Sequence, residues 1–197
     1  RHFIGLEDGT PLHLLGTDKL GRDILSRGIV GSRITLMIAL VSITLITIIG
    51  TLTGITSGYL GGRFDQWFQR FVEVILAFPQ LPLYLALTTL IPVTAPSYLF
   101  LGFVILVISG LGWARLSREV RAKTMSLARA DYVRAAPAIG ASDSRIITHH
   151  ILPNVTSHVI VAITLGIPTI ILLESFLGFL GFAVKPPLIS WGLMLQD

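Results

Sequence analysis

The stretch DYVRAAPAIGASDSRIITHHILPN, residues 131–154, is polar and basic and lies between runs too apolar to face water. We call it the polar segment. We predict two short helical pieces hinged at Gly140, because glycine suits a helix C-terminus and Ser142 or Asp143 can cap the next helix. A water-facing connector of this length between apolar runs indicates that something soluble docks on it.

The composition of the whole sequence indicates an integral membrane protein. Only 13% of its 197 residues are charged, against about 25% in soluble domains, and its mean hydropathy is +0.77. Long uncharged runs account for this deficit, so we predict an all-α, polytopic fold. Because Arg1 is not an initiator Met and no signal peptide leads the chain, we expect a fragment that lacks at least its start.

Four transmembrane helices are predicted, at about residues 34–58, 74–92, 97–114 and 155–173. In the first, Gly50, Gly54 and Gly58 recur every four residues and form a nearly flat face on which another helix can approach closely. In the second, Pro79 and Pro82 break the helix and free backbone carbonyls that protein or a wet cavity must satisfy. These prolines are candidates for a translocation path, although such kinks also occur without function.

The two ends of the chain are not predicted to span the membrane. Residues 1–33 are predicted to hold an amphipathic helix in the membrane interface, capped by Thr17 or Asp18; a solvated linker helix is the alternative. Residues 174–197 are apolar but interrupted by glycine and proline, which favours a re-entrant or interfacial segment. Glu174, an ionisable group close to the bilayer, and Gly178 are further candidates for the path.

The orientation follows from the distribution of positive charge. Residues 115–150 carry seven Lys and Arg against three Asp and Glu, so the loop 115–154 is predicted to be cytoplasmic and both ends extracytoplasmic. The cations that begin this loop can also act simply as an anchor at anionic lipid. The net charge of +4 is explained loop by loop, and we expect no nucleic-acid partner.

Within the polar segment, Asp131 can cap a helix. Ala135, Ala136 and Gly140 give that helix a face almost without side chains, on which the surface of another protein can reach the backbone. Pro153, after Leu152, is predicted to begin the turn back into the membrane.

Several of these residues carry a family resemblance. The spacing of Ala135-Ala136, Gly140 and Leu152-Pro153 is similar to that of the EAA motif of bacterial ABC importer permeases. GTDKLGRDILSR (16–27), GSRITL (31–36) and ESFLGFLGFAVKPPLISWG (174–192) resemble the dipeptide, oligopeptide and nickel branch of that family. The sequence is most similar to the second, C-type permease subunit of the branch.

The resemblance implies a six-helix fold in the bacterial plasma membrane, with one span before residue 1 and one after residue 197. It implies peptide transport, although nickel, opines and sugars also use this branch. The implied partners are ATP-binding cassette subunits, a different permease chain, an extracytoplasmic solute-binding protein and membrane lipid. The residues expected to couple to the ATPase are Asp131, Arg134, Ala135, Ala136, Gly140, Leu152 and Pro153.

Two residues depart from the family pattern. Arg134 stands where the motif has Glu, so a cation replaces a carboxylate that could contact the ATPase. Pro137 would break a helix interior, and we expect it to fit only if the helix begins near Val133 and leaves it in the first turn.

Other functions are tested against the same sequence. There is no G-x-x-x-x-G-K-[ST] motif, so we expect ATP hydrolysis on another subunit and no enzyme activity or cofactor in this chain. His149, His150 and His158 lack zinc-site spacing, the sequence has no Cys, and no nucleophile motif is present. An intramembrane enzyme is therefore disfavoured. A stand-alone secondary transporter or channel stays open as the alternative, although no inverted repeat supports it.

Overall fold

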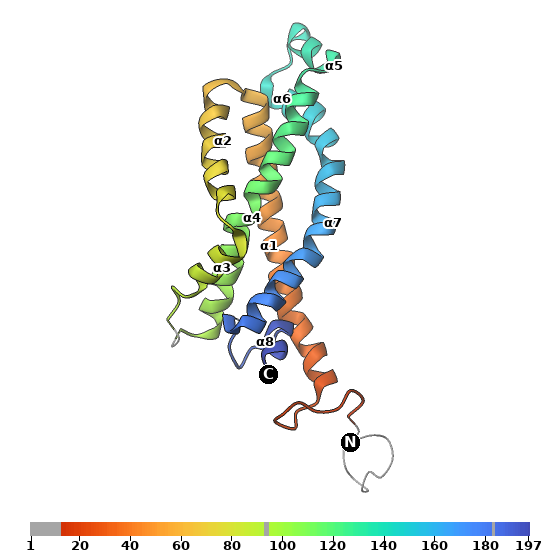
Figure 1. The fold of residues 1–197 in the computed structure, drawn as a ribbon. Helices are drawn as coiled ribbons and strands as arrows, with labels where there is room; N and C mark the ends of the chain where they lie inside the picture. The colour runs from red at the N-terminus through yellow and green to blue at the C-terminus, as the bar shows by residue number, and fades with distance from the viewer. Residues whose placement is uncertain (1–12, 93–94, 183) are drawn as a thin grey trace.

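The structure is a computed structural model that describes residues 13–92, 95–182 and 184–197 (Figure 1). These residues are almost entirely helical, which confirms the predicted all-α, polytopic fold. The α-helices are α1 (Ile24–Leu60), α2 (Gly62–Ala77), α3 (Gln80–Thr88), α4 (Ser97–Ala128), α5 (Asp131–Ala135), α6 (Asp143–Ile146), α7 (Leu152–Leu177) and α8 (Trp191–Gln196). A 3₁₀ turn covers Ala136–Ile139, and π-turns cover Ile147–Ile151 and Gly178–Phe182.

Helix α1 begins later than the predicted interfacial helix and is continuous with the first span. Its N-cap is Asp23, whose carboxylate accepts a 2.8 Å hydrogen bond from the Ser26 N–H. Hydrogen bonds from Ser26 hold the pKa of Asp23 below its usual value. The prediction of a cap at Thr17 or Asp18 is wrong, because the Asp18 carboxylate closes a turn ahead of the helix by accepting from two nearby backbone N–H groups. Residues 1–12 of the predicted lead-in lie outside the described residues.

Helices α1 and α4 pack closely along the predicted glycine face. With 37 residues, α1 is about 55 Å long, more than the roughly 30 Å hydrocarbon core of a bilayer. A Cβ on Gly54 would lie 2.6 Å from the Ser117 carbonyl oxygen, and one on Gly58 would lie 2.8 Å from that of Arg121. The two helices therefore meet through their backbones. Fully buried apolar side chains such as Ile38, Ile108 and Val155 form the core that α1 and α4 share with α7.

Residues 62–88, which overlap the predicted second span at 74–92, form the pair of helices α2 and α3. Residues 59–73 are mostly helical, because α2 packs an apolar face that includes Val72 against α4. α2 and α3 meet at an angle of 80° at Pro79. Three helices of the described residues are long and apolar enough to cross a membrane, and α2 with α3 makes a fourth only if the bent pair is one broken span. Pro82 lies in the first turn of α3, where its missing N–H costs no helical hydrogen bond.

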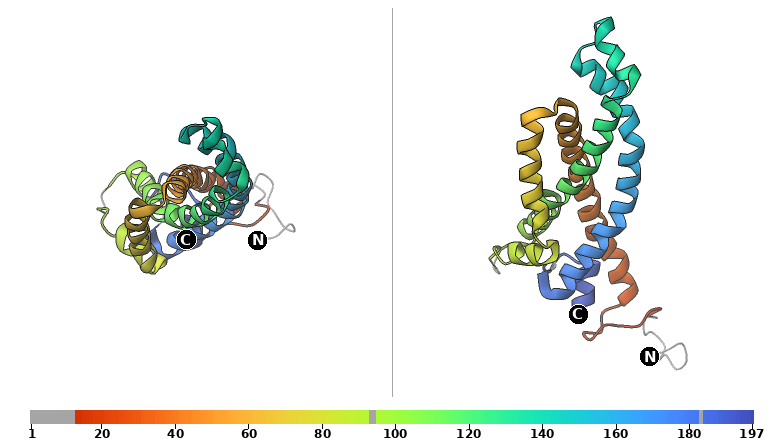
Figure 2. Two further views of the ribbon diagram at one scale, coloured as in Figure 1. Left: turned by 90° about the horizontal axis from the view of Figure 1, so that it is seen from above. Right: turned by 45° about the horizontal axis from the view of Figure 1, so that its top comes forward.

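The third and fourth spans are longer than predicted. α4 does not end at residue 114 but continues to Ala128, so its cations lie on a helix and not in a loop. Asp143–Phe182 is one helical run, and the predicted turn at Pro153 is wrong. After Gly181, whose φ of 89° is left-handed, the chain doubles back and α8 packs beside α7 and α1 (Figure 2). This is the shape expected of a re-entrant or interfacial segment, and its depth in a membrane stays a prediction.

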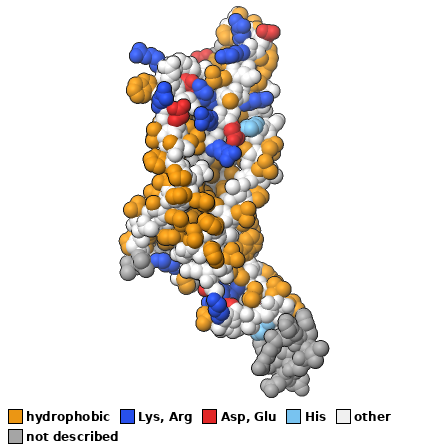
Figure 3. Space-filling view, in the orientation of Figure 1, with side chains coloured by type: hydrophobic (Ala, Val, Ile, Leu, Met, Phe, Trp, Pro, Cys, Tyr) orange, Lys and Arg blue, Asp and Glu red, His pale blue; other side chains and the backbone are white. Residues whose placement is uncertain are grey.

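The polar segment and the two ends of the described chain lie at opposite ends of the bundle (Figure 1). Most Lys, Arg, Asp and Glu side chains visible in Figure 3 gather at the end that carries the polar segment, above a broad hydrophobic zone. The polar segment and the two ends of the described chain therefore lie on opposite sides of that zone. Which end faces the cytoplasm stays a prediction.

Candidate docking surface

Helix α5, in the first half of the polar segment, begins one residue earlier than it would if Asp131 were its N-cap. The N-cap of α5 is Ala130, and Asp131 is the first helical residue, where its carboxylate makes no capping bond but suits the positive end of the helix. α5 starts at Asp131 and not near Val133. Pro137 is accommodated differently from the prediction, because the helix changes to a 3₁₀ turn at Ala136 and Pro137 lies at its start.

The hinge forms where it is predicted. Gly140 has φ 84°, a left-handed conformation that other L-residues rarely adopt, and its N–H donates to the Pro137 carbonyl at 2.9 Å. Ser142 is the N-cap of α6, and its hydroxyl accepts from the Arg145 N–H at 3.4 Å. The hinge at Gly140 and the cap at Ser142 are therefore confirmed, but only the first helical piece is short, because the second continues into α7.

The second half of the segment runs directly into α7 through the π-turn Ile147–Ile151. The Leu152 N–H donates to the carbonyl of Ile147, five residues back. Pro153 has no N–H to donate. The wider turn before it accommodates the proline, so the helix does not end there. Leu152 and Pro153 thus begin α7, with both side chains exposed.

One face of the polar segment is buried in the bundle and the other is exposed. Val133, Ala136, Ile146 and Ile151 lie in the main core cluster and are almost completely buried. Ala136 was predicted to lie on a surface open to a partner, but its side chain packs on the bundle and is 3% exposed. These four residues, which we call the foot of the segment, therefore hold it in place.

The exposed face is a small apolar tip beside a cation. Ala135 and Gly140 are exposed as predicted, together with Arg134. Ile139, which sequence reasoning missed, is 86% exposed, the largest exposure of any large hydrophobic side chain in the described residues. A bulky apolar residue directly before the hinge glycine is the signal that could have revealed it. Such a residue at a polar tip suits insertion into a hollow on a partner.

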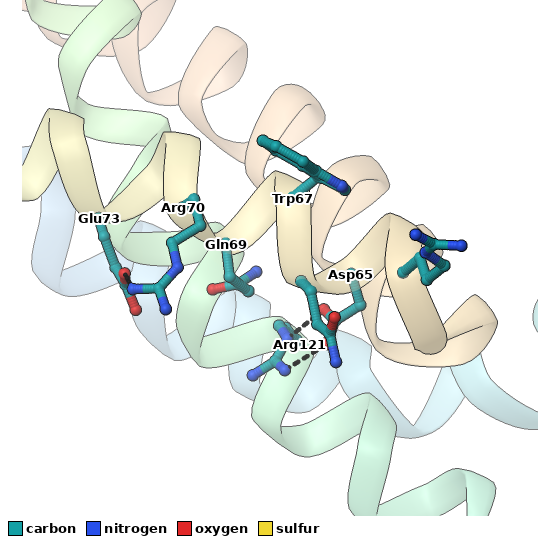
Figure 4. Close-up of a pocket in the computed structure, with 8 residues that line it drawn as sticks. Asp65, Trp67, Gln69, Arg70, Glu73 and Arg121 are labelled. Carbon is teal, nitrogen blue, oxygen red and sulfur yellow. Dashed lines mark hydrogen bonds and ion pairs between the residues drawn. The ribbon is translucent and has the colours of Figure 1, made fainter.

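A polar groove of about 760 Å³ lies between α2 and α4, close to the same end of the bundle (Figure 4). Asp65 of α2 accepts two hydrogen bonds of 2.5 Å from the Arg121 guanidinium of α4 and one from the Ser57 hydroxyl of α1. On the rim, Arg70 and Glu73 form an exposed ion pair of 3.1 Å. Sequence reasoning missed the Asp65–Arg121 pair, because only the fold brings positions so far apart together.

The four candidates for the translocation path lie in two separate places. Pro79 and Pro82 are exposed at the bend between α2 and α3. Glu174 is buried and accepts a 3.1 Å hydrogen bond from the Thr35 hydroxyl of α1, and a Cβ on Gly178 would lie 2.3 Å from Cα of Gly192. In this conformation Glu174 and Gly178 pack against neighbouring segments. A path lined by these four residues stays a prediction.

Within the described ranges, no three His, Asp or Glu side chains come close enough together to hold a metal ion. The features that remain are an exposed tip on a buried foot, carried between two long membrane helices.

Residues 50–197 match the family of binding-protein-dependent transport system inner membrane components, and the chain belongs to that family. It is 40% identical over 185 residues to the oligopeptide transport system permease protein OppC of Haemophilus influenzae, and 38% to OppC of Bacillus subtilis. It is 37% identical to the dipeptide transport system permease protein DppC of Bacillus subtilis. Each match covers 94% of this chain, which spans 56 to 59% of the length of these relatives.

These matches confirm the resemblance to the C-type permeases of the oligopeptide and dipeptide branch. Together with the long apolar helices, they make the chain a multi-pass protein of the inner membrane.

Proposed function

We propose that this chain is part of the permease subunit of an ABC importer that carries peptides, driven by ATP hydrolysis on separate subunits. The observation that carries the proposal is the exposed tip at Ile139 and Gly140, held on a foot that is buried in the bundle. Peptides are favoured over nickel, opines or sugars because the relatives are named for oligopeptide and dipeptide transport.

In this proposal the polar segment docks on an ATP-binding subunit. α4 ends at Ala128, three residues before Asp131, and α7 begins at Leu152. A displacement of the segment therefore acts on two membrane-crossing helices at once. Because its foot is packed into the core with α1, the displacement cannot be absorbed by a loose loop.

The remaining partners follow from the same family. A second, different permease chain would pair with this one in the membrane. An extracytoplasmic solute-binding protein would deliver peptide at the end of the bundle where both described termini lie. A stand-alone secondary transporter or channel needs neither partner, and no feature of the described residues favours it.

Replacing the exposed Ile139 tests the docking surface. In Ile139→Asp, we expect the full-length permease to insert and fold normally, because the side chain touches little of its own chain, but to lose most of its bound ATPase. The loss should be about 30-fold or more in affinity, since a buried apolar anchor of an interface contributes at least about 2 kcal/mol. Co-purification of the ATP-binding subunits with the permease measures this.

Leu90→Asp is the matched control. Leu90 is 70% exposed and follows α3, which lies in the half of the bundle away from the polar segment (Figure 1). Its replacement should leave the bound ATPase unchanged. If Ile139→Asp binds as much ATPase as the unaltered permease, the docking surface is not here.

A further inference from the structure

One directional contact ties the polar segment to the rest of the bundle. The hydroxyl of Tyr59, one residue before the end of α1, donates a 2.7 Å hydrogen bond to Oδ1 of Asp143, the first residue of α6. Among the described residues, no other side-chain hydrogen bond or ion pair joins the polar segment to α1, α2, α3 or α4. The other contacts that hold its foot are apolar.

The apolar foot and the hydrogen bond constrain different things. Apolar burial favours contact but has no preferred direction, so the packed foot resists separation more strongly than a small rotation. A hydrogen bond to a carboxylate is short and angular, and it fixes the position of one group relative to another. The Tyr59–Asp143 bond therefore sets the angle at which the segment sits on α1.

The end of α1 that carries Tyr59 is itself fastened to two other helices. Ser57 donates a 2.5 Å hydrogen bond to Asp65 of α2, which also receives the two bonds from Arg121 of α4. At Gly58, the backbone of α1 is in contact with the Arg121 carbonyl and with Thr124. α1, α2 and α4 thus form one block at this end, and a group bonded to Tyr59 is bonded to the block.

We propose that Tyr59 and Asp143 are positioning residues that fix the polar segment to the end of α1, so that segment and helix move as one body during the transport cycle. This inference rests on the proposed function, because it concerns how the docked ATPase moves the membrane helices. In this proposal neither residue contacts the solute or ATP. Their role is to prevent slippage between the docking tip and the helices it drives.

The test compares Tyr59→Phe with the unaltered full-length permease, assembled in proteoliposomes with its partner permease, its ATPase subunits and its solute-binding protein. The variant loses only the hydroxyl. We expect peptide uptake per ATP hydrolysed to fall about fivefold, the factor that one net hydrogen bond represents. The amount of bound ATPase should stay the same, because the tip at Ile139 is unchanged.

Matched variants separate this role from a general loss of stability. Tyr132→Phe removes another hydroxyl from the polar segment, one that is half exposed, and should leave uptake per ATP unchanged. Asp143→Asn keeps an oxygen that can accept from Tyr59 and should retain most of the coupling. Asp143→Ala keeps none and should behave like Tyr59→Phe.

A cross-link tests movement directly. The sequence contains no Cys, so Tyr59→Cys combined with Asp143→Cys introduces a single thiol pair into it. Joining the two with a short, cleavable bifunctional thiol reagent should restore the uptake per ATP that the two substitutions lower.

Two results would overturn the inference: a cross-link that stops uptake until it is cleaved, or unchanged coupling in Tyr59→Phe. If the unaltered permease binds no ATPase, the proposed function fails as well, and this is visible before any variant is made.

Discussion

Gly54→Leu is expected to prevent α1 and α4 from packing and to abolish stable permease. Any Cβ at this position lies 2.6 Å from the backbone oxygen of Ser117 and 2.8 Å from Cβ of Val120. A backbone oxygen cannot rotate away, so the helices must separate over several turns. We expect a loss of about 3 kcal/mol or more in the free energy of unfolding, the upper end of the range for overpacked cores. Thermal unfolding of the full-length permease in detergent measures it.

Gly110→Leu provides the comparison for this prediction. Gly110 lies on α4, and a Cβ there would have nothing within 4 Å. The leucine also favours a helix over glycine by close to 1 kcal/mol. Gly110→Leu should therefore be as stable as the unaltered protein or more so. Equal unfolding temperatures for the Gly54 and Gly110 variants would show that α1 and α4 do not meet as described.

Asp65→Ala is expected to be the most damaging replacement of a charged residue near the groove. It leaves the Arg121 guanidinium, which is 24% exposed, without its carboxylate, and breaks the hydrogen bond from Ser57. Removing one partner of a buried ion pair typically costs about 3 to 5 kcal/mol, because the remaining charge is left uncompensated. The partial exposure of Arg121 favours the lower end of this range. The measurement is again thermal unfolding of the full-length permease.

Two further variants make this prediction specific. Asp65→Leu combined with Arg121→Met removes both charges and should recover much of the lost stability. Glu73→Ala removes an exposed ion pair from the same groove, since Arg70 is 81% exposed, and should change stability by less than about 1 kcal/mol. If Asp65→Ala were as harmless as Glu73→Ala, the pair would not hold α2 to α4.

The features that were predictable from the sequence depend on local pattern. Long uncharged runs identify the spans because a backbone in lipid must be helical. The four-residue spacing of Gly50, Gly54 and Gly58 is visible without knowing the partner helix. Gly140 and Ser142 mark the hinge because left-handed backbone and helix caps favour particular residues.

The features that were missed depend on choices between competing local bonds or on distant contacts. Asp18 and Asp23 are equally good caps by residue type, and only the turn that Asp18 closes decides between them. The polar stretch after Tyr59 is helical because its apolar face meets α4, and its charged face concealed this. A proline such as Pro153 usually ends a helix, but the π-turn before it lets the helix continue. The burial of Ala136 follows from the packed foot, which no local pattern encodes.

The contact between Thr35 and Glu174 has a consequence for how the chain enters the membrane during synthesis. The Thr35 hydroxyl donates to Glu174 and accepts from the Trp191 N–H at 3.0 Å, so one side chain of α1 serves two groups that are synthesised later. A carboxylate without a partner is costly in lipid. We therefore expect α1 to be inserted before the last turn of α7 and the chain after it take their final places, since Thr35 serves one group from each.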